Sequence, residues 1–161
     1  MAGIEILKAG YKLSYFKGEY YSVSAEKARG IGRRLIYPMN NAEGMIGIHS
    51  VLDVDGRVRL GPYFYPCVQL NYSIDDTNKP SFYSGARRLF PHIGYDDIEP
   101  ESTGIVPRVF AAGQPFRDFV IKDEGDSGFP GFINLIGIES PGLTSSPVIA
   151  DSVADLLQWP A

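Results

Sequence analysis

Short apolar stretches separated by turn residues dominate the hydrophobic pattern of the chain, which predicts more strands than helices. Four β-rich segments come first, with Asn40-Asn41 and Asp55-Gly56 among the turn signals between them, and they fit an antiparallel meander. The four segments are 18–24, 34–39, 45–53 and 56–62. A second pair of strands is predicted at 105–111 and 116–122.

Helical spacing of apolar residues occurs in the segment 81–90, which ends before Pro91. Phe82, Ala86 and Phe90 share one face of this segment, so it predicts a helix packed on the meander. A second helix is predicted at 148–157, where Asp151 and Asp155 lie opposite the apolar positions.

A strand, a turn and a helix are predicted at the C-terminal end of the chain. The apolar stretch 132–138 is broken by Ser140-Pro141-Gly142, and the helix follows with a cap at Thr144, Ser145 or Ser146 and Pro147 in its first turn. Free N–H groups at such a helix start stabilise negative charge by about 0.3–1 kcal/mol. From the pattern alone, a purely structural turn is the commoner explanation.

Composition indicates a globular chain of 161 residues, 44% of them apolar and 21% charged. The net charge of −4, with scattered basic residues, argues against a nucleic-acid partner. No apolar run reaches the ~18 residues of a membrane span, so we expect no transmembrane segment. Cys67 is the only cysteine and His49 and His92 are the only histidines, so no metal site is predicted.

The longest motif of the chain is Ile-Asn-Leu-Ile-Gly-Ile-Glu-Ser-Pro-Gly-Leu-Thr at 133–144. Six further motifs lie at 17–21, 35–38, 47–49, 55–56, 58–62 and 118–121, and the whole set spans most of residues 11–158. In their wording and their order, these segments resemble FAD-dependent oxidoreductases of the D-amino-acid oxidase superfamily, in the branch around L-2-hydroxyglutarate dehydrogenase.

The resemblance implies an α+β fold: an antiparallel substrate-domain sheet with packed helices, followed by the last strand and helix of an incomplete FAD-binding domain. It places the substrate-binding part at 1–130 and the FAD-binding strand, turn and helix at 131–161. The strand–Gly-x-Gly-x-x-Gly–helix unit of such enzymes is not found in the sequence, because 29–33 lacks the third glycine and the preceding strand. We therefore interpret the chain as the C-terminal part of a flavoenzyme, with three alternatives open: a separately expressed domain, a truncated or split gene product, or a proteolytic fragment. In the case of a split gene, an N-terminal FAD-binding polypeptide would be its partner.

The resemblance also implies roles for individual residues. The cofactor-binding residues would be Ser140, Pro141, Gly142, Leu143, Thr144 and Ser145, facing the electron-rich edge of the FAD ring. Gly142 would let the backbone approach that ring. His49 is the candidate catalytic base, because imidazole titrates near neutral pH. The alternative for His49 is a histidine that only satisfies a hydrogen bond on a half-buried strand.

A carboxylate-bearing substrate calls for a cation, and Arg108 is the candidate, with Tyr20 and Tyr37 as further substrate-binding residues. Val106 stands where related enzymes have an arginine, so the substrate class stays open, and Arg108 as an ordinary strand-edge charge is an equal alternative. Glu19 is a second acid–base candidate if it faces the cavity, and solvent exposure is the alternative.

Two hypotheses for function follow. In the first, the chain is the substrate-binding and flavin-capping portion of an FAD-dependent oxidoreductase that oxidises a small 2-hydroxy acid, 2-hydroxyglutarate-like, or a related amine or hydroxy substrate, and it is inactive as an isolated fragment. In the second, it is a non-catalytic binding or structural module derived from that domain. A soluble, cytoplasmic protein is the default expectation, and an organellar or membrane-associated location stays open.

Overall fold

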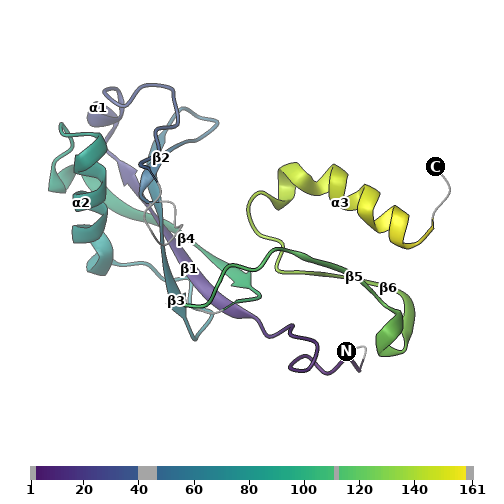
Figure 1. The fold of residues 1–161 in the computed structure, drawn as a ribbon. Coiled ribbons are helices and arrows are strands. Elements are labelled where there is room, and N and C mark those ends of the chain that lie inside the picture. The colour runs from purple at the N-terminus through teal and green to yellow at the C-terminus, as the bar shows by residue number, and fades with distance from the viewer. Residues whose placement is uncertain (1–2, 40–46, 111–112, 159–161) are drawn as a thin grey trace. The chain divides into compact units, whose positions relative to one another are not determined.

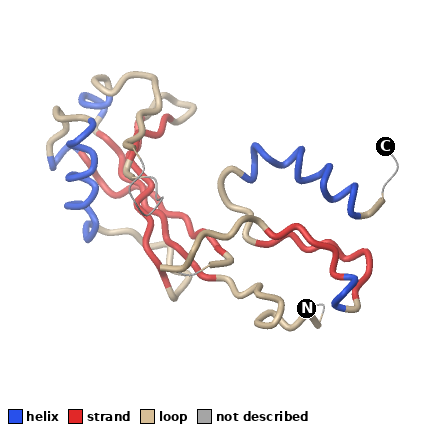
Figure 2. The backbone as a smooth tube through the Cα atoms, viewed as in Figure 1, coloured by secondary structure: helices blue, strands red, loops and turns tan. Residues whose placement is uncertain are grey.

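A computed structural model describes residues 3–39, 47–110 and 113–158 of the chain. The chain divides into two compact units, one formed by residues 17–105 and the other by residues 1–16 together with 106–161. Figure 1 shows the order of helices and strands, and Figure 2 shows which parts of the backbone are regular. The architecture is α+β, as the sequence predicts.

The main sheet has four strands in the order β2-β3-β1-β4. The strands are β1 (Ser14–Val23), β2 (His49–Leu52), β3 (Val58–Cys67) and β4 (Ile98–Arg108). β2 and β3 form the predicted antiparallel hairpin, which turns where Asp53 N–H donates to the Arg57 carbonyl at 2.9 Å. Gly56 takes a φ of 78° in this turn, a conformation that favours glycine.

The predicted meander is wrong in its strand order. β1 lies between β3 and β4, so chain neighbours are not sheet neighbours there. Residues 34–38 form no strand; instead Ile36 N–H donates to Ser50 Oγ at 2.9 Å, and Ser50 N–H donates to the Ile36 carbonyl at 3.2 Å. Alternation identifies a strand but not its partner, which explains the error.

One helix covers a face of the sheet, as predicted for 81–90. It is α2 (Lys79–Leu89), and it begins two residues earlier than predicted because Pro80 suits a first helical turn. Phe82 and Ala86 are fully buried, and the ring of Phe82 stacks on Tyr21 with 4.1 Å between centroids. Burying a side chain such as Phe82 contributes about 1.5–3 kcal/mol. The core therefore lies between α2 and this face of the sheet.

Short elements complete this unit. They are α1 (Ala25–Ala28) and the single-turn 3-10 helices at Asp76–Asn78 and Tyr95–Asp97. The loop after α1 contains the 29–33 segment, and Ile31 of that loop is buried in the core. That packing connects the loop to the same core as α2.

The second unit is built on a two-stranded antiparallel hairpin of β5 (Val120–Glu124) and β6 (Phe129–Ile136), joined by a 3-10 turn at Gly125–Ser127. The predicted pairing of 105–111 with 116–122 is therefore wrong, because 105–108 belong to β4 and β5 pairs with the strand that follows it.

A buried carboxylate anchors this hairpin. Glu124 is fully buried and accepts hydrogen bonds from Asn134 Nδ2 and Ser127 Oγ, each at 3.0 Å. The phenol of Tyr11 also hydrogen-bonds to Glu124, and this bond and that of Asn134 lower the pKa of the Glu124 carboxyl. Burial, followed by the contact with Glu124, raises the pKa of Tyr11 to about 12. The carboxylate thus ties the N-terminal segment to β6.

Candidate functional site

His49 and Tyr37, two of the predicted site residues, lie in direct contact. Their rings stack with centroids 4.1 Å apart and planes 24° apart. His49 is the first residue of β2 and pairs with Gly61 of β3. Ile48 and Leu60 are core residues on the α2 face, so strand alternation places His49 and Gly61 on the opposite face of the sheet.

Tyr20, a third predicted site residue, lies on the same face. A side chain on Gly61 would put a Cβ 2.8 Å from Tyr20 Cδ1 and 2.7 Å from the Glu19 carbonyl oxygen, so only glycine fits between them. Burial raises the pKa of Tyr20, the Arg59 guanidinium lowers it, and the nearby Tyr37 phenol raises it further. The structure thus brings together a His49 cluster, consisting of His49, Tyr37, Tyr20 and Arg59.

The ring of His49 is arranged to accept a proton. His49 is 6% exposed, and its Nδ1 lies 3.0 Å from the Gly47 carbonyl oxygen, which can only accept a hydrogen bond. Nδ1 therefore carries the hydrogen in the neutral ring, and Nε2 holds a free electron pair. Burial lowers the pKa of His49, and the hydrogen bond to Gly47 partly offsets this effect. The neutral form consequently dominates at pH values near 7.

Arg59 was missed by the sequence reasoning. Its Cζ lies 5.7 Å from the centroid of the Tyr20 ring. Its Nε is 3.6 Å from Glu101 Oε2 and its Nη2 is 3.8 Å from Asp53 Oδ2, both beyond good hydrogen-bonding distance. The alternation of buried Val58 and Leu60 around it was the available signal, because it puts Arg59 on the face of His49.

Arg108, the predicted substrate cation, binds a carboxylate of the chain itself. Both Nε and Nη2 of Arg108 donate to Glu139 Oε2, at 2.9 and 2.8 Å. The guanidinium also lies against the rings of Phe16 and Phe110, 4.8 and 5.4 Å from their centroids. Its role toward a substrate stays a prediction, whereas its structural role is to hold Glu139 directly before the predicted cofactor turn.

Local hydrogen bonds in the predicted cofactor turn leave two of its backbone N–H groups without a partner among the described residues. Gly142 N–H donates to the Glu139 carbonyl at 2.5 Å, and Ser145 N–H donates to the Pro141 carbonyl at 3.0 Å. Between them, the N–H groups of Leu143 and Thr144 have no hydrogen-bond partner among the described residues. A surface hollow of about 320 Å³ opens here, lined by Glu139, Ser140, Pro141, Leu143 and Thr144.

Helix α3 (Gly142–Leu156) starts earlier than predicted. The predicted caps at 144–146 lie inside the helix, and Pro147 lies in its interior rather than in its first turn. Pro147 cannot donate to the Leu143 carbonyl, and the Ser146 hydroxyl donates to that oxygen instead at 2.8 Å. Gly142 is buried against Ile138, whose side chain would collide with any Cβ at position 142.

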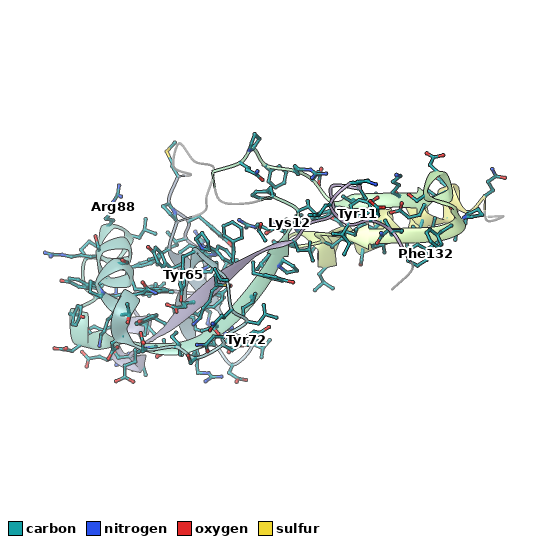
Figure 3. All side chains as sticks on the ribbon, turned by 90° about the horizontal axis from the view of Figure 1, so that it is seen from below. Tyr11, Lys12, Tyr65, Tyr72, Arg88 and Phe132 are labelled. Carbon is teal, nitrogen blue, oxygen red and sulfur yellow. The ribbon has the colours of Figure 1, made fainter. Side chains whose placement is uncertain are left out.

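Glu19 points away from the His49 cluster. It is 3% exposed, so the alternative of solvent exposure is wrong. Its carboxylate accepts hydrogen bonds from the Tyr65 hydroxyl at 2.5 Å and Asn78 Nδ2 at 2.8 Å, and Lys17 Nζ lies 3.5 Å away. Figure 3 labels Tyr65 in this part of the molecule. These partners use the carboxylate for structure, joining β1 and β3 to the segment before α2.

Within the described ranges, no group of His, Cys, Asp and Glu side chains is placed to hold a metal ion. The helices of the described residues are all too short or too polar to cross a bilayer.

The family model described as "FAD dependent oxidoreductase" matches residues 2–156. The chain therefore belongs to the FAD-dependent oxidoreductase family of the D-amino-acid oxidase type. It is 35% identical over 151 residues to the mitochondrial L-2-hydroxyglutarate dehydrogenase of Arabidopsis thaliana, a match that covers 88% of this chain and 31% of the relative. The chain thus spans about a third of that protein. It is also 51% identical over 41 residues to glycerol 3-phosphate dehydrogenase of Caloramator mitchellensis, a match that covers 26% of this chain and 8% of the relative.

Two solved structures share the fold. L-α-glycerophosphate oxidase of Mycoplasma pneumoniae with FAD bound matches with a TM-score of 0.67 and 20% identity, over 92% of this chain and 37% of its own. Glycerol-3-phosphate dehydrogenase of Bacillus halodurans complexed with FAD matches with a TM-score of 0.56 and 18% identity, over 91% of this chain and 27% of the dehydrogenase chain. FAD is therefore the cofactor that the family and these neighbours indicate.

Proposed function

We propose that this chain is the substrate-binding and flavin-capping portion of an FAD-dependent enzyme that oxidises a small 2-hydroxy acid, 2-hydroxyglutarate-like, or a related hydroxy or amine substrate. The observation that carries the proposal is the His49 ring, whose Nδ1 is occupied by the Gly47 carbonyl and whose Nε2 is free to accept a proton. The family membership and the identity to an L-2-hydroxyglutarate dehydrogenase support it.

Oxidation of a secondary alcohol removes a hydride from carbon and a proton from oxygen. FAD, when bound, supplies the hydride acceptor. His49 takes the hydroxyl proton at Nε2, and its lowered pKa keeps the ring neutral and ready for that transfer. The ring of Tyr37 stacks on His49, Tyr20 lies on the same face of the sheet as His49, and their hydroxyls would orient the substrate.

The turn before α3 fits the electron-rich edge of a flavin. The free N–H groups of Leu143 and Thr144, with the helix dipole behind them, suit negative charge on the ring. Ser140, Pro141, Gly142 and Ser145 shape the same turn. Residues 131–161 would thus belong to the FAD-binding part and residues 1–130 to the substrate-binding part, with an N-terminal FAD-binding polypeptide as the partner.

A substrate carboxylate requires a cation, and Arg108 is proposed for this role. Its pairing with Glu139 means that the substrate must displace or share that carboxylate. Arg59 is the second candidate, because it lies within the His49 cluster and its ion pairs are long.

A cytoplasmic location remains the default expectation, with a mitochondrial one suggested by the relative's name.

The second candidate function is a non-catalytic binding or structural module. Val106 in the expected arginine position and the Arg108–Glu139 ion pair favour it, because both reduce the positive charge offered to a substrate. In this case flavin binding would persist without substrate oxidation.

The test joins the chain to a dinucleotide-binding half, its own or that of the Arabidopsis relative. We expect visible flavin absorbance that bleaches anaerobically on addition of L-2-hydroxyglutarate or another 2-hydroxy acid. The His49→Gln variant should keep the absorbance and lose the bleaching. Bound flavin that no 2-hydroxy acid reduces would indicate the module, and a complex without bound flavin would overturn both functions.

A further inference from the structure

A hollow of about 510 Å³ in the 17–105 unit is lined by arginines. Arg29 and Arg33 come from the loop after α1, and Arg57 comes from the β2–β3 turn. Val23 and Val58 supply part of an apolar lining. The residues that line this Arg29 pocket include no member of the His49 cluster, so the proposed oxidation does not use it.

Two acidic side chains also line the Arg29 pocket, and each lies 3.6 Å from an arginine. Asp55 lies 3.6 Å from Arg57 Nη2, which is also 3.3 Å from Asp53 Oδ2. Glu101 lies 3.6 Å from Arg59 Nε. These carboxylates therefore have cationic neighbours of their own.

Arg29 and Arg33 have no oppositely charged partner among the described residues. In the part of the chain that the structure describes, neither side chain forms an ion pair or a hydrogen bond. Three arginines and two carboxylates line the pocket, an excess of one positive charge, and the two arginines that lack an acidic partner in the described structure are four residues apart on one loop. Two such guanidinium groups, beside apolar side chains, complement an organic dianion.

We propose that the Arg29 pocket is a binding site for a small phosphomonoester. A guanidinium fork pairs with two oxygens of a phosphate at once, and a phosphate dianion has three terminal oxygens to share between Arg29 and Arg33. Val23 and Val58 contact the organic part of the ligand. A monocarboxylate offers one charge and two oxygens, so it matches the pocket less well.

The experiment is isothermal titration of the 161-residue chain with phenyl phosphate, at a pH of about 8, where a phosphomonoester with a second pKa of about 6 is a dianion. Benzoate and benzyl alcohol are the monoanionic and neutral comparisons. The variants are Arg29→Gln, Arg33→Gln and the control Arg88→Gln, which removes an exposed arginine on α2, labelled in Figure 3, that does not line the pocket.

We expect saturable binding of phenyl phosphate that is weakened about fivefold or more in each of the two pocket variants, because each loses a charge-assisted contact. The Arg88→Gln variant should bind as the unchanged chain does, and benzyl alcohol should not bind. Absence of saturable binding, or equal weakening in all three variants, overturns the proposal. Since the assay needs no flavin and no turnover, its failure leaves the proposed oxidation untouched.

Discussion

Tyr37 lies face to face with His49, at 4.1 Å between ring centroids, and half of Tyr37 remains exposed to solvent. Tyr37 thereby covers one face of the imidazole while its own outer surface meets water. The desolvation that lowers the pKa of His49 thus depends on a side chain that is easily changed without disturbing the core.

Replacing Tyr37 by Ala should raise the pKa of His49 toward its unfolded value of about 6.5, because water then reaches the ring. Titration of the His49 ring by NMR measures this, with the resonances of His92 as an internal control. A pKa of His49 that is unchanged or lower in Tyr37→Ala would contradict the role given to the stacked ring.

Stability should fall as the pH is lowered through the pKa of His49. The folded pKa is depressed, so the unfolded chain binds more protons in the region below about 6.5, and the free energy of unfolding decreases there. The His49→Gln variant should lose this part of the pH dependence. Urea denaturation at a series of pH values measures it; curves of identical shape for both proteins would exclude the effect.

Removing His49 as a base should slow catalysis in the assembled enzyme by about 10²–10⁴-fold, the usual contribution of a general base. In the His49→Gln variant we expect kcat to fall while flavin absorbance stays the same. The matched control is His92→Gln, since His92 is exposed and its Nε2 lies near the Lys27 carbonyl. Unchanged turnover in His49→Gln would remove His49 from the chemistry.

Arg108 and Glu139 should be coupled energetically. Replacing either by Ala leaves a largely buried partner without its charge-assisted hydrogen bonds, which costs about 1–3 kcal/mol. In a double-mutant cycle, the combined variant should lose less than the sum of the single ones, as measured by urea denaturation. The Arg108→Lys variant should recover only part of the stability, because lysine lacks the fork. Additive losses would show that the pair contributes nothing.

Gly142→Ala should destabilise the start of α3 by about 1–3 kcal/mol, because its Cβ would overlap the side chain of Ile138. Gly104→Ala is the matched control, since a Cβ there meets no atom of the described structure within 4 Å. Thermal denaturation of both variants measures the difference in their transition temperatures. Equal transition temperatures would mean that the contact with Ile138 is readily relieved.

The sequence by itself determined the helix and the turn that depend on residues close together in the chain. The spacing of Phe82 and Ala86 and the stop at Pro91 predicted α2, and Asp55-Gly56 marked the β2–β3 turn. The family was also visible in the sequence, because its motifs are contiguous runs of residues that need no fold to be compared.

Only the tertiary structure decided which distant segments meet. The order β2-β3-β1-β4, the pairing of Arg108 with Glu139 and the burial of Glu19 all join residues far apart in the chain. The alternation of apolar and polar residues along a strand indicates its two faces, but it does not predict which strand or helix covers each face. That choice rests on the packing of the whole unit, and for this reason Arg59 beside Tyr20 was found only in the structure.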